Sequence, residues 1–144
     1  MSTKSSLLHD ACAEKAGMDG FVYCARRPFH PRRFCQVISA EWPGVSRIKG
    51  FIWLADCPDT VGLWHWAEGV CTVSPAGRWW AARPEIDWPA SLAVRAEIRR
   101  GWHDCYGDRR QEVVFIGSEL DRAGLTAFLD AALVSEEELT ERLY

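Results

Sequence analysis

The spacing of apolar residues divides the first third of the chain into a strand and a helix. Residues 20–27 are rich in β-branched and aromatic side chains, which is typical of a strand. Pro31 suits the first turn of a helix. The apolar residues that follow it at helical spacing are Phe34, Val37, Ile38 and Trp42. The Trp-Pro-Gly run at 42–44 should end that helix.

The middle of the chain predicts three strands joined by tight turns. Residues 46–55 and 60–67 should pair as a hairpin through a turn at 57–59. Residues 70–75 would add a short third strand after a turn at 68–69.

The last third predicts a helix, a strand and a second helix. Residues 76–89 lack a clean period, and we expect a loop that crosses the sheet. Residues 91–102 are a helix candidate, and 112–118 form the clearest strand. The clearest helix spans 120–133, with Asp121 as its N-cap.

This order predicts an α+β fold with a mostly antiparallel sheet and helices packed on one face. The arrangement is similar to a ferredoxin-like split βαβ unit with an extra strand. We divide the chain into a polar leader (1–18), one domain (19–134) and an acidic tail (135–144) that we expect to fray.

Composition narrows the function classes. Of the 144 residues, 48% are hydrophobic and 26% charged, which indicates a globular domain. The net charge of −3 argues against a nucleic-acid partner. We found neither an apolar stretch of membrane length nor a signal peptide, so we expect a cytoplasmic protein, no membrane partner and six cysteines as thiols.

Four separated motifs carry a resemblance to a known family. They are FVYCARRPFHPRRF (21–34), WPGVSRIKGFIWLA (42–55), AGRWWAA (76–82) and YGDRRQEVVFIGSELD (106–121). Together they resemble the C-terminal domain of the CobW family of metal-handling GTPases, over about residues 20–133. The resemblance implies a domain that follows a P-loop GTPase domain, in proteins implicated in zinc allocation, cobalt handling for cobalamin and metalloenzyme activation.

The chain also departs from that family. It contains neither the GxxxxGK[ST] phosphate-binding motif nor the family's CxCC metal motif. With no other catalytic motif present, we expect a non-enzymatic module in metal homeostasis or metalloenzyme maturation. Its partner would be a P-loop GTPase domain or a metal-receiving client, and the eight tryptophans also permit a homodimer. The alternative is a stand-alone zinc- or cobalt-binding protein.

A basic run is the first candidate docking site. Arg26 and Arg27 precede His30, and two more arginines follow in the first helical turn. These guanidiniums could bind a phosphate or carboxylate, or they could be a solvated strand end that packs against the acidic tail. His30, at the N-cap, could contact a metal or a partner, or accept an amide hydrogen bond that fixes the turn.

The run GDRRQE (107–112) is the second candidate. We predict that Arg109, Arg110 and Glu112 form a polar patch that docks a GTPase domain or client. A charge ladder that fixes strand register is the alternative. Side chains alternate along a strand, so the two arginines should point to opposite faces.

Zinc-competent side chains suggest a metal site. His103 and Cys105 could supply two ligands, and a third would come from His65, Cys35 or Cys57. His65 could instead be a core residue on an apolar strand face.

Overall fold

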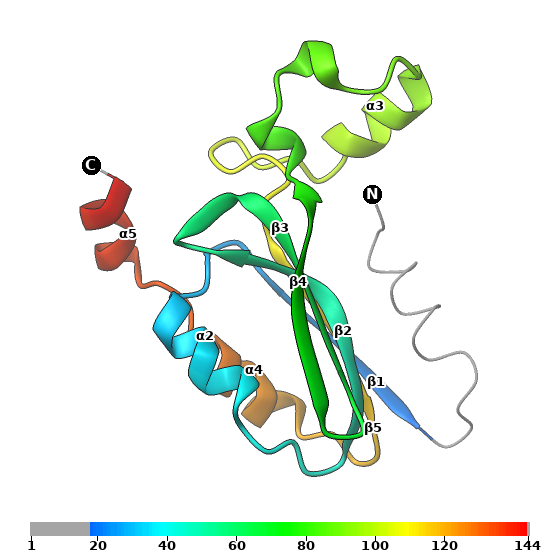
Figure 1. Ribbon diagram of the computed structural model, residues 1–144, viewed down its shortest axis with the longest axis vertical. Helices are drawn as coiled ribbons and strands as arrows, with labels where there is room; N and C mark the ends of the chain where they lie inside the picture. The colour runs from blue at the N-terminus through cyan, green and yellow to red at the C-terminus, as the bar shows by residue number, and fades with distance from the viewer. Residues whose placement is uncertain (1–17, 144) are drawn as a thin grey trace.

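The computed structural model describes residues 18–143, which form one antiparallel sheet with helices around it (Figure 1). The strands are β1 (Asp19–Ala25), β2 (Val45–Leu54), β3 (Cys57–Ala67), β4 (Val70–Arg78) and β5 (Gln111–Gly117). The helices are α2 (Pro31–Ile38), α3 (Leu92–Arg99), α4 (Arg122–Asp130) and α5 (Glu136–Leu143), with two 3-10 turns, η1 (Trp80–Ala82) and η2 (Glu85–Asp87). The predicted leader lies almost wholly outside the described residues.

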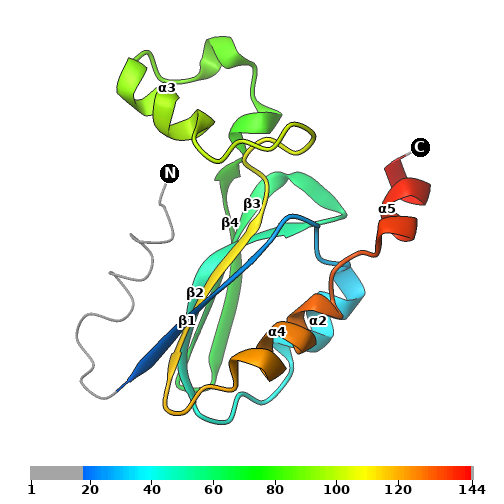
Figure 2. The same cartoon turned by 180° about the vertical axis from the view of Figure 1, so that it is seen from behind.

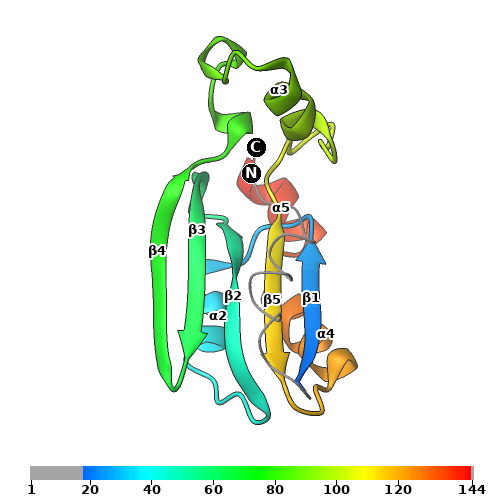
Figure 3. The same ribbon diagram turned by 90° about the vertical axis from the view of Figure 1, so that its right-hand side faces the viewer.

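The strand order is β1-β5-β2-β3-β4, and every neighbouring pair is antiparallel (Figure 3). Strand β5 lies between β1 and β2, which therefore run parallel to each other. This is the predicted split βαβ unit, because α2 connects β1 to β2. The predicted fold class is confirmed, with β3 and β4 extending the sheet on one side.

Helices α2 and α4 cover one face of the sheet (Figures 1 and 2). Between them and the strands lies an aromatic core centred on Trp64, which is fully buried. The Trp64 ring centroid lies 5.4 Å from that of Phe34 on α2, and 6.0 Å from those of Trp42 and Phe115. Trp64 and Trp66 share this face while Val61 packs on the other, as strand alternation predicts.

Helix α2 ends earlier than its apolar spacing predicts. Its last residue is Ile38, and the Ser39 hydroxyl at the C-cap donates back to the Cys35 carbonyl before the chain turns. Trp42 lies outside the helix, yet it is only 7% exposed and still packs into the core. Its apolar character was read correctly, and only the helical assignment was wrong.

The predicted turn at 57–59 is also wrong. Strand β3 already begins at Cys57, so the hairpin reverses at Ala55 and Asp56. Strand β4 is correspondingly longer than predicted and reaches Arg78, which pairs with Thr60.

Residues 79–110 do not cross the sheet. They include α3 and form a lobe beyond the last residues of β4 and the first residues of β3 (Figures 1 and 2). Helix α3 begins after Ser91, whose hydroxyl accepts the Val94 amide, and it ends at Arg99, three residues short of the predicted end.

Most of the predicted acidic tail is helical, as α5 (Glu136–Leu143). Its first turn is a capping box, in which the Ser135 hydroxyl accepts the Glu138 amide and the Glu138 carboxylate accepts the Ser135 amide. No helix within residues 18–143 has the length and apolar character needed to cross a membrane.

Candidate functional site at the end of the sheet

The run at 107–112 joins the lobe to the sheet. Gly107 has a φ of +64°, which lets the chain turn into β5. Asp108 is 6% exposed, and its carboxylate accepts the amides of Trp80 at 3.0 Å and Ala81 at 2.9 Å. Asp108 thus holds η1 against the start of β5.

The two arginines of this run point in different directions. The Arg109 Nε donates to the Pro58 carbonyl at 2.7 Å, and its Nη2 lies 2.9 Å from the Asp59 carboxylate. Arg110 instead pairs with Glu112, with Nε 3.2 Å from Oε1. The two arginines therefore bind different partners, and only Arg110 is paired with Glu112.

Glu112 is a poor candidate for direct contact with a partner. It is only 4% exposed, and its Oε2 is buried with no hydrogen-bond partner in the part of the chain that the structure describes. The Arg109 and Arg110 side chains are 18% and 15% exposed, and of the two only Arg109 lies beside the exposed Asp59 at the start of β3.

Gln111 is a site residue that the sequence analysis missed. It is fully buried, and its Oε1 accepts the Trp53 amide at 2.9 Å while its Nε2 donates to the Trp53 carbonyl at 2.7 Å. The same Nε2 also donates to the Arg27 carbonyl. The pairing of β2 with β5 ends at Phe51 and Glu112, so the Gln111 side-chain amide bonds the Trp53 backbone just beyond the last paired residues. A polar residue opening an otherwise apolar strand was the available signal.

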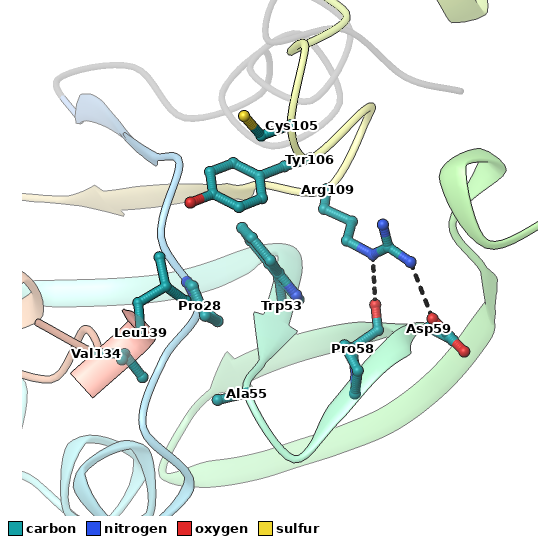
Figure 4. Close-up of a pocket in the computed structure, with 10 residues that line it drawn as sticks. All are labelled: Pro28, Trp53, Ala55, Pro58, Asp59, Cys105, Tyr106, Arg109, Val134 and Leu139. Carbon is teal, nitrogen blue, oxygen red and sulfur yellow. Dashed lines mark hydrogen bonds and ion pairs between the residues drawn. The ribbon is translucent and has the colours of Figure 1, made fainter. Parts of the chain in front are cut away.

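A cavity of about 470 Å³ opens beside this run (Figure 4). Four chain segments line it: the β1–α2 connection, the β2–β3 hairpin, the loop before β5, and the chain from Val134 to Leu139. Its lining residues are Pro28, Trp53, Ala55, Pro58, Asp59, Cys105, Tyr106, Arg109, Val134 and Leu139. Most are apolar, and Arg109 with Asp59 supplies the charge. A few polar groups on an apolar lining are typical of a binding pocket.

The basic run before α2 is bound to backbone carbonyls. The Arg26 guanidinium donates to Gly107 and Arg109, at 2.8 and 3.1 Å, and to Gly101. Burial lowers the pKa of Arg26, with a smaller contribution from the nearby positive charge of Arg110. Arg26 therefore stabilises the loop that carries the cavity wall.

Two more arginines of the basic run, Arg27 and Arg33, also donate to backbone carbonyls, in the segment that leads into α5. Arg27 donates to the Val134 carbonyl at 3.2 Å. Arg33 donates to the Leu133 carbonyl and forms a two-pronged ion pair with Glu138, at 2.9 and 2.8 Å. The basic run was interpreted either as an anion-binding site or as a strand end that packs against the acidic tail. Arg33 fits the second interpretation, because it pairs with Glu138 of the tail.

His30 is the N-cap of α2, as predicted. Its Nδ1 accepts the Arg32 amide at 3.2 Å, which replaces the side-chain oxygen usual at this position. The hydrogen bond that fixes the turn is therefore present. Contact with a metal or partner would have to use Nε2.

The structure does not gather the predicted metal ligands. The His103 Nδ1 accepts the amides of Cys105 and Tyr106, at 3.0 and 3.2 Å, and its ring stacks on that of Tyr106. His65 lies within the sheet between Lys49 and Thr72, and is only partly buried rather than a core residue. Over residues 18–143, no three His, Cys, Asp or Glu side chains form a group that could bind a metal ion.

Comparison with known proteins identifies the domain. Residues 18–133 match the model of the cobalamin synthesis protein cobW C-terminal domain. The chain belongs to this family. The match covers the whole sheet, α2, α4 and three of the four segments that line the cavity, all but the chain from Val134 to Leu139.

Relatives and solved structures agree with this assignment. The CobW C-terminal domain described here is 38% identical over 127 residues to the zinc-regulated GTPase metalloprotein activator 1 of Dictyostelium discoideum, covering 85% of this chain and 26% of that protein. It is 32% identical over 123 residues to a zinc chaperone of Mycobacterium tuberculosis, covering 81% and 30%. The Zn(II)-bound YjiA GTPase from E. coli shares the fold, with a TM-score of 0.52 at 14% identity over 86% of this chain and 32% of that one. The chain thus spans about a quarter to a third of these proteins.

Proposed function

We propose that this CobW C-terminal domain is a docking module in zinc homeostasis or metalloenzyme maturation, and that it contacts either a GTPase domain or a metal-receiving client. The observation that supports this most directly is the family match over 18–133, combined with relatives named as a zinc chaperone and a zinc-regulated metalloprotein activator. The Dictyostelium activator and YjiA are named as GTPases, and this chain covers only 26% and 32% of them.

We further propose that the chain contributes no catalysis of its own. The charged side chains of the GDRRQE run are engaged in holding the fold: Asp108 accepts two amides, Arg110 pairs with Glu112, and Arg109 binds the start of β3. A docking role needs such a rigid scaffold and exposed surface around it, and it requires no reacting group.

A binding assay tests the proposal. The full chain would be mixed with the GTPase region of the Dictyostelium relative, with GDP or a non-hydrolysable GTP analogue and with or without Zn²⁺. We expect a complex that depends on nucleotide or zinc, and a changed rate of GTP hydrolysis by the GTPase region. No complex in any of the four states would contradict docking to a GTPase domain. GTP hydrolysis by the chain alone would contradict the non-catalytic role.

A metal titration tests the alternative of a stand-alone metal-binding protein. Chain purified under reducing conditions would be stripped and titrated with zinc and with cobalt. Tight, stoichiometric binding that is lost in both His103→Ala and Cys105→Ala would favour a metal carrier over a docking module. Binding unchanged by either substitution would exclude the predicted ligand pair.

A further inference from the structure

We propose that the 470 Å³ cavity at the end of the sheet binds a peptide segment of the partner protein, in which an apolar side chain lies next to a carboxylate. The proposal rests on the docking function proposed above and names the surface and the chemistry that such docking would use.

The apolar part of the ligand is set by the cavity walls. Trp53 and Tyr106 form an aromatic wall, with ring centroids 5.2 Å apart (Figure 4). Pro28, Val134 and Leu139 complete the lining on the α5 side. The volume is within the range of roughly 300–1,000 Å³ of ligand pockets, and the lining offers contact to an aromatic or branched aliphatic side chain.

The carboxylate is set by Arg109. Its Nε and Nη2 are bound to Pro58 and Asp59, whereas Nη1 has no partner among the residues that the structure describes. The side chain is 18% exposed, so the remaining N–H donors are partly withdrawn from water. Asp59 is 57% exposed and competes with an incoming anion for the same guanidinium. A charge-assisted bond from arginine to carboxylate is the strongest polar contact available here.

The walls are held in place before any ligand arrives. The Gln111 side-chain amide binds both the N–H and the carbonyl of Trp53. Arg26 binds three carbonyls of the loop that carries Tyr106. A preformed pocket reduces the entropy lost on binding.

The shape of the cavity favours a peptide over a free small molecule. Trp53, Pro28 and Val134 are buried at its base, whereas Pro58, Asp59 and Cys105 at its rim are exposed. A side chain can therefore enter the base while the backbone that carries it stays at the rim, within reach of Arg109.

The test uses acetylated, amidated peptides that pair Phe, Trp or Leu with a neighbouring Asp or Glu, each with an Asn or Gln counterpart. Binding to the full chain would be followed by NMR of the tryptophan indole N–H groups. We expect the acidic peptides to bind about tenfold or more tightly than their amide counterparts, as for loss of a hydrogen bond to a charged group.

Three variants separate a ligand-binding Arg109 from a structural one. Arg109→Gln should remove the preference for acidic peptides, whereas Asp59→Asn should strengthen it by freeing the guanidinium. A merely structural Arg109–Asp59 pair predicts the same response to both. Ala55→Phe, at the hairpin reversal, should fill the cavity and abolish binding of every peptide.

Several results would overturn the proposal: no peptide binding, equal binding of acidic and amide peptides, or the same change for Arg109→Gln and Asp59→Asn. Binding of N-acetylphenylalanine or N-acetylleucine as tightly as the peptides would assign the cavity to a small carboxylate and also overturn it.

The outcome is distinguishable from that of the docking function. If the GTPase region binds the chain and Ala55→Phe leaves that complex unchanged, docking occurs elsewhere and only the cavity proposal fails. If acidic peptides bind but no partner protein does, the cavity stands and the proposed function fails.

Discussion

The two ends of the sheet differ in how far polar side chains contribute to their packing. Under α2 and α4, the core is a contiguous set of aromatic and aliphatic side chains around Trp64. At the opposite end, beside the lobe of residues 79–110, a smaller apolar cluster of Trp53, Val61 and Trp79 is joined by hydrogen bonds from polar side chains to backbone groups. Asp108, Gln111 and Arg26 make these bonds. Apolar contacts are non-directional, whereas a buried polar side chain needs a partner at one place. The polar end therefore carries the more specific geometry, and the cavity lies there.

Truncation of a core side chain at the end under α2 and α4 should cause the largest loss of stability. We expect Trp64→Ala to lower the free energy of unfolding by about 3–5 kcal/mol, because it empties the centre of the core. Urea unfolding followed by circular dichroism measures this. Trp64→Phe is the matched control, since it keeps an aromatic ring and removes an indole Nε1 that has no hydrogen-bond partner within the described residues. A Trp64→Phe loss as large as that of Trp64→Ala would show that shape, and not buried area, dominates.

The polar end should respond next. Gln111→Leu keeps the volume but leaves the Trp53 amide and carbonyl without their side-chain partner, so we expect a loss of about 2–3 kcal/mol. Hydrogen exchange at the Trp53 amide would locate the effect. Gln36→Leu, at an exposed position of α2, should change stability by less than about 0.5 kcal/mol. Equal effects of the two substitutions would mean that Gln111 does not hold this end.

His103 should contribute a smaller, local amount. We expect His103→Ala to cost about 1 kcal/mol, because the amides of Cys105 and Tyr106 lose their side-chain acceptor. Zinc titration of the same variant should match that of the unaltered chain. A fall in zinc affinity would return His103 to the list of metal ligands.

The smallest expected effect is a pH dependence confined to α5. Hydrogen bonding to Arg33, with a smaller contribution from the Ser135 amide, lowers the pKa of Glu138 from 4.5 to about 2. A depressed folded-state pKa stabilises the folded form above the unfolded pKa, and this stabilisation is lost as pH falls from about 4.5 toward 2.

The protection of the Leu139 amide, whose N–H donates to the Ser135 carbonyl, should therefore fall in that interval, when its exchange rate is compared with the intrinsic rate at each pH. Glu138→Gln should remove the pH dependence, and Glu137→Gln at the exposed neighbouring position should retain it. Persistence of the dependence in Glu138→Gln would assign it to another carboxylate.

Sequence patterns were a good guide wherever a periodic apolar face decides the structure. The β5 strand and the Asp121-capped α4 follow directly from spacing and capping. Sequence patterns failed where a tertiary contact outweighs local preference, as at Cys57–Asp59. All three residues of this predicted turn belong to the start of β3, where Arg109 binds the Pro58 carbonyl and the Asp59 carboxylate.

The candidate site was predictable only in part. The sequence singled out Arg109 by its charge and position, and that residue does line the cavity. It did not reveal Trp53, Tyr106 or Pro28 as walls, because each belongs to a different segment and looks like an ordinary core or loop residue. It also grouped Arg109 with Arg110 and Glu112, which lie close in sequence but point to different surroundings.

The sequence by itself determined the α+β class, the split βαβ order and the CobW resemblance, since periodicity and motifs are local properties of the chain. Only the tertiary structure decided which groups meet at the end of the sheet. Arg109 reaches a carbonyl 51 residues away, and Gln111 binds an amide 58 residues away. No local pattern encodes such pairings, because the position of a hydrogen-bond partner is fixed only once the strands between them have aligned.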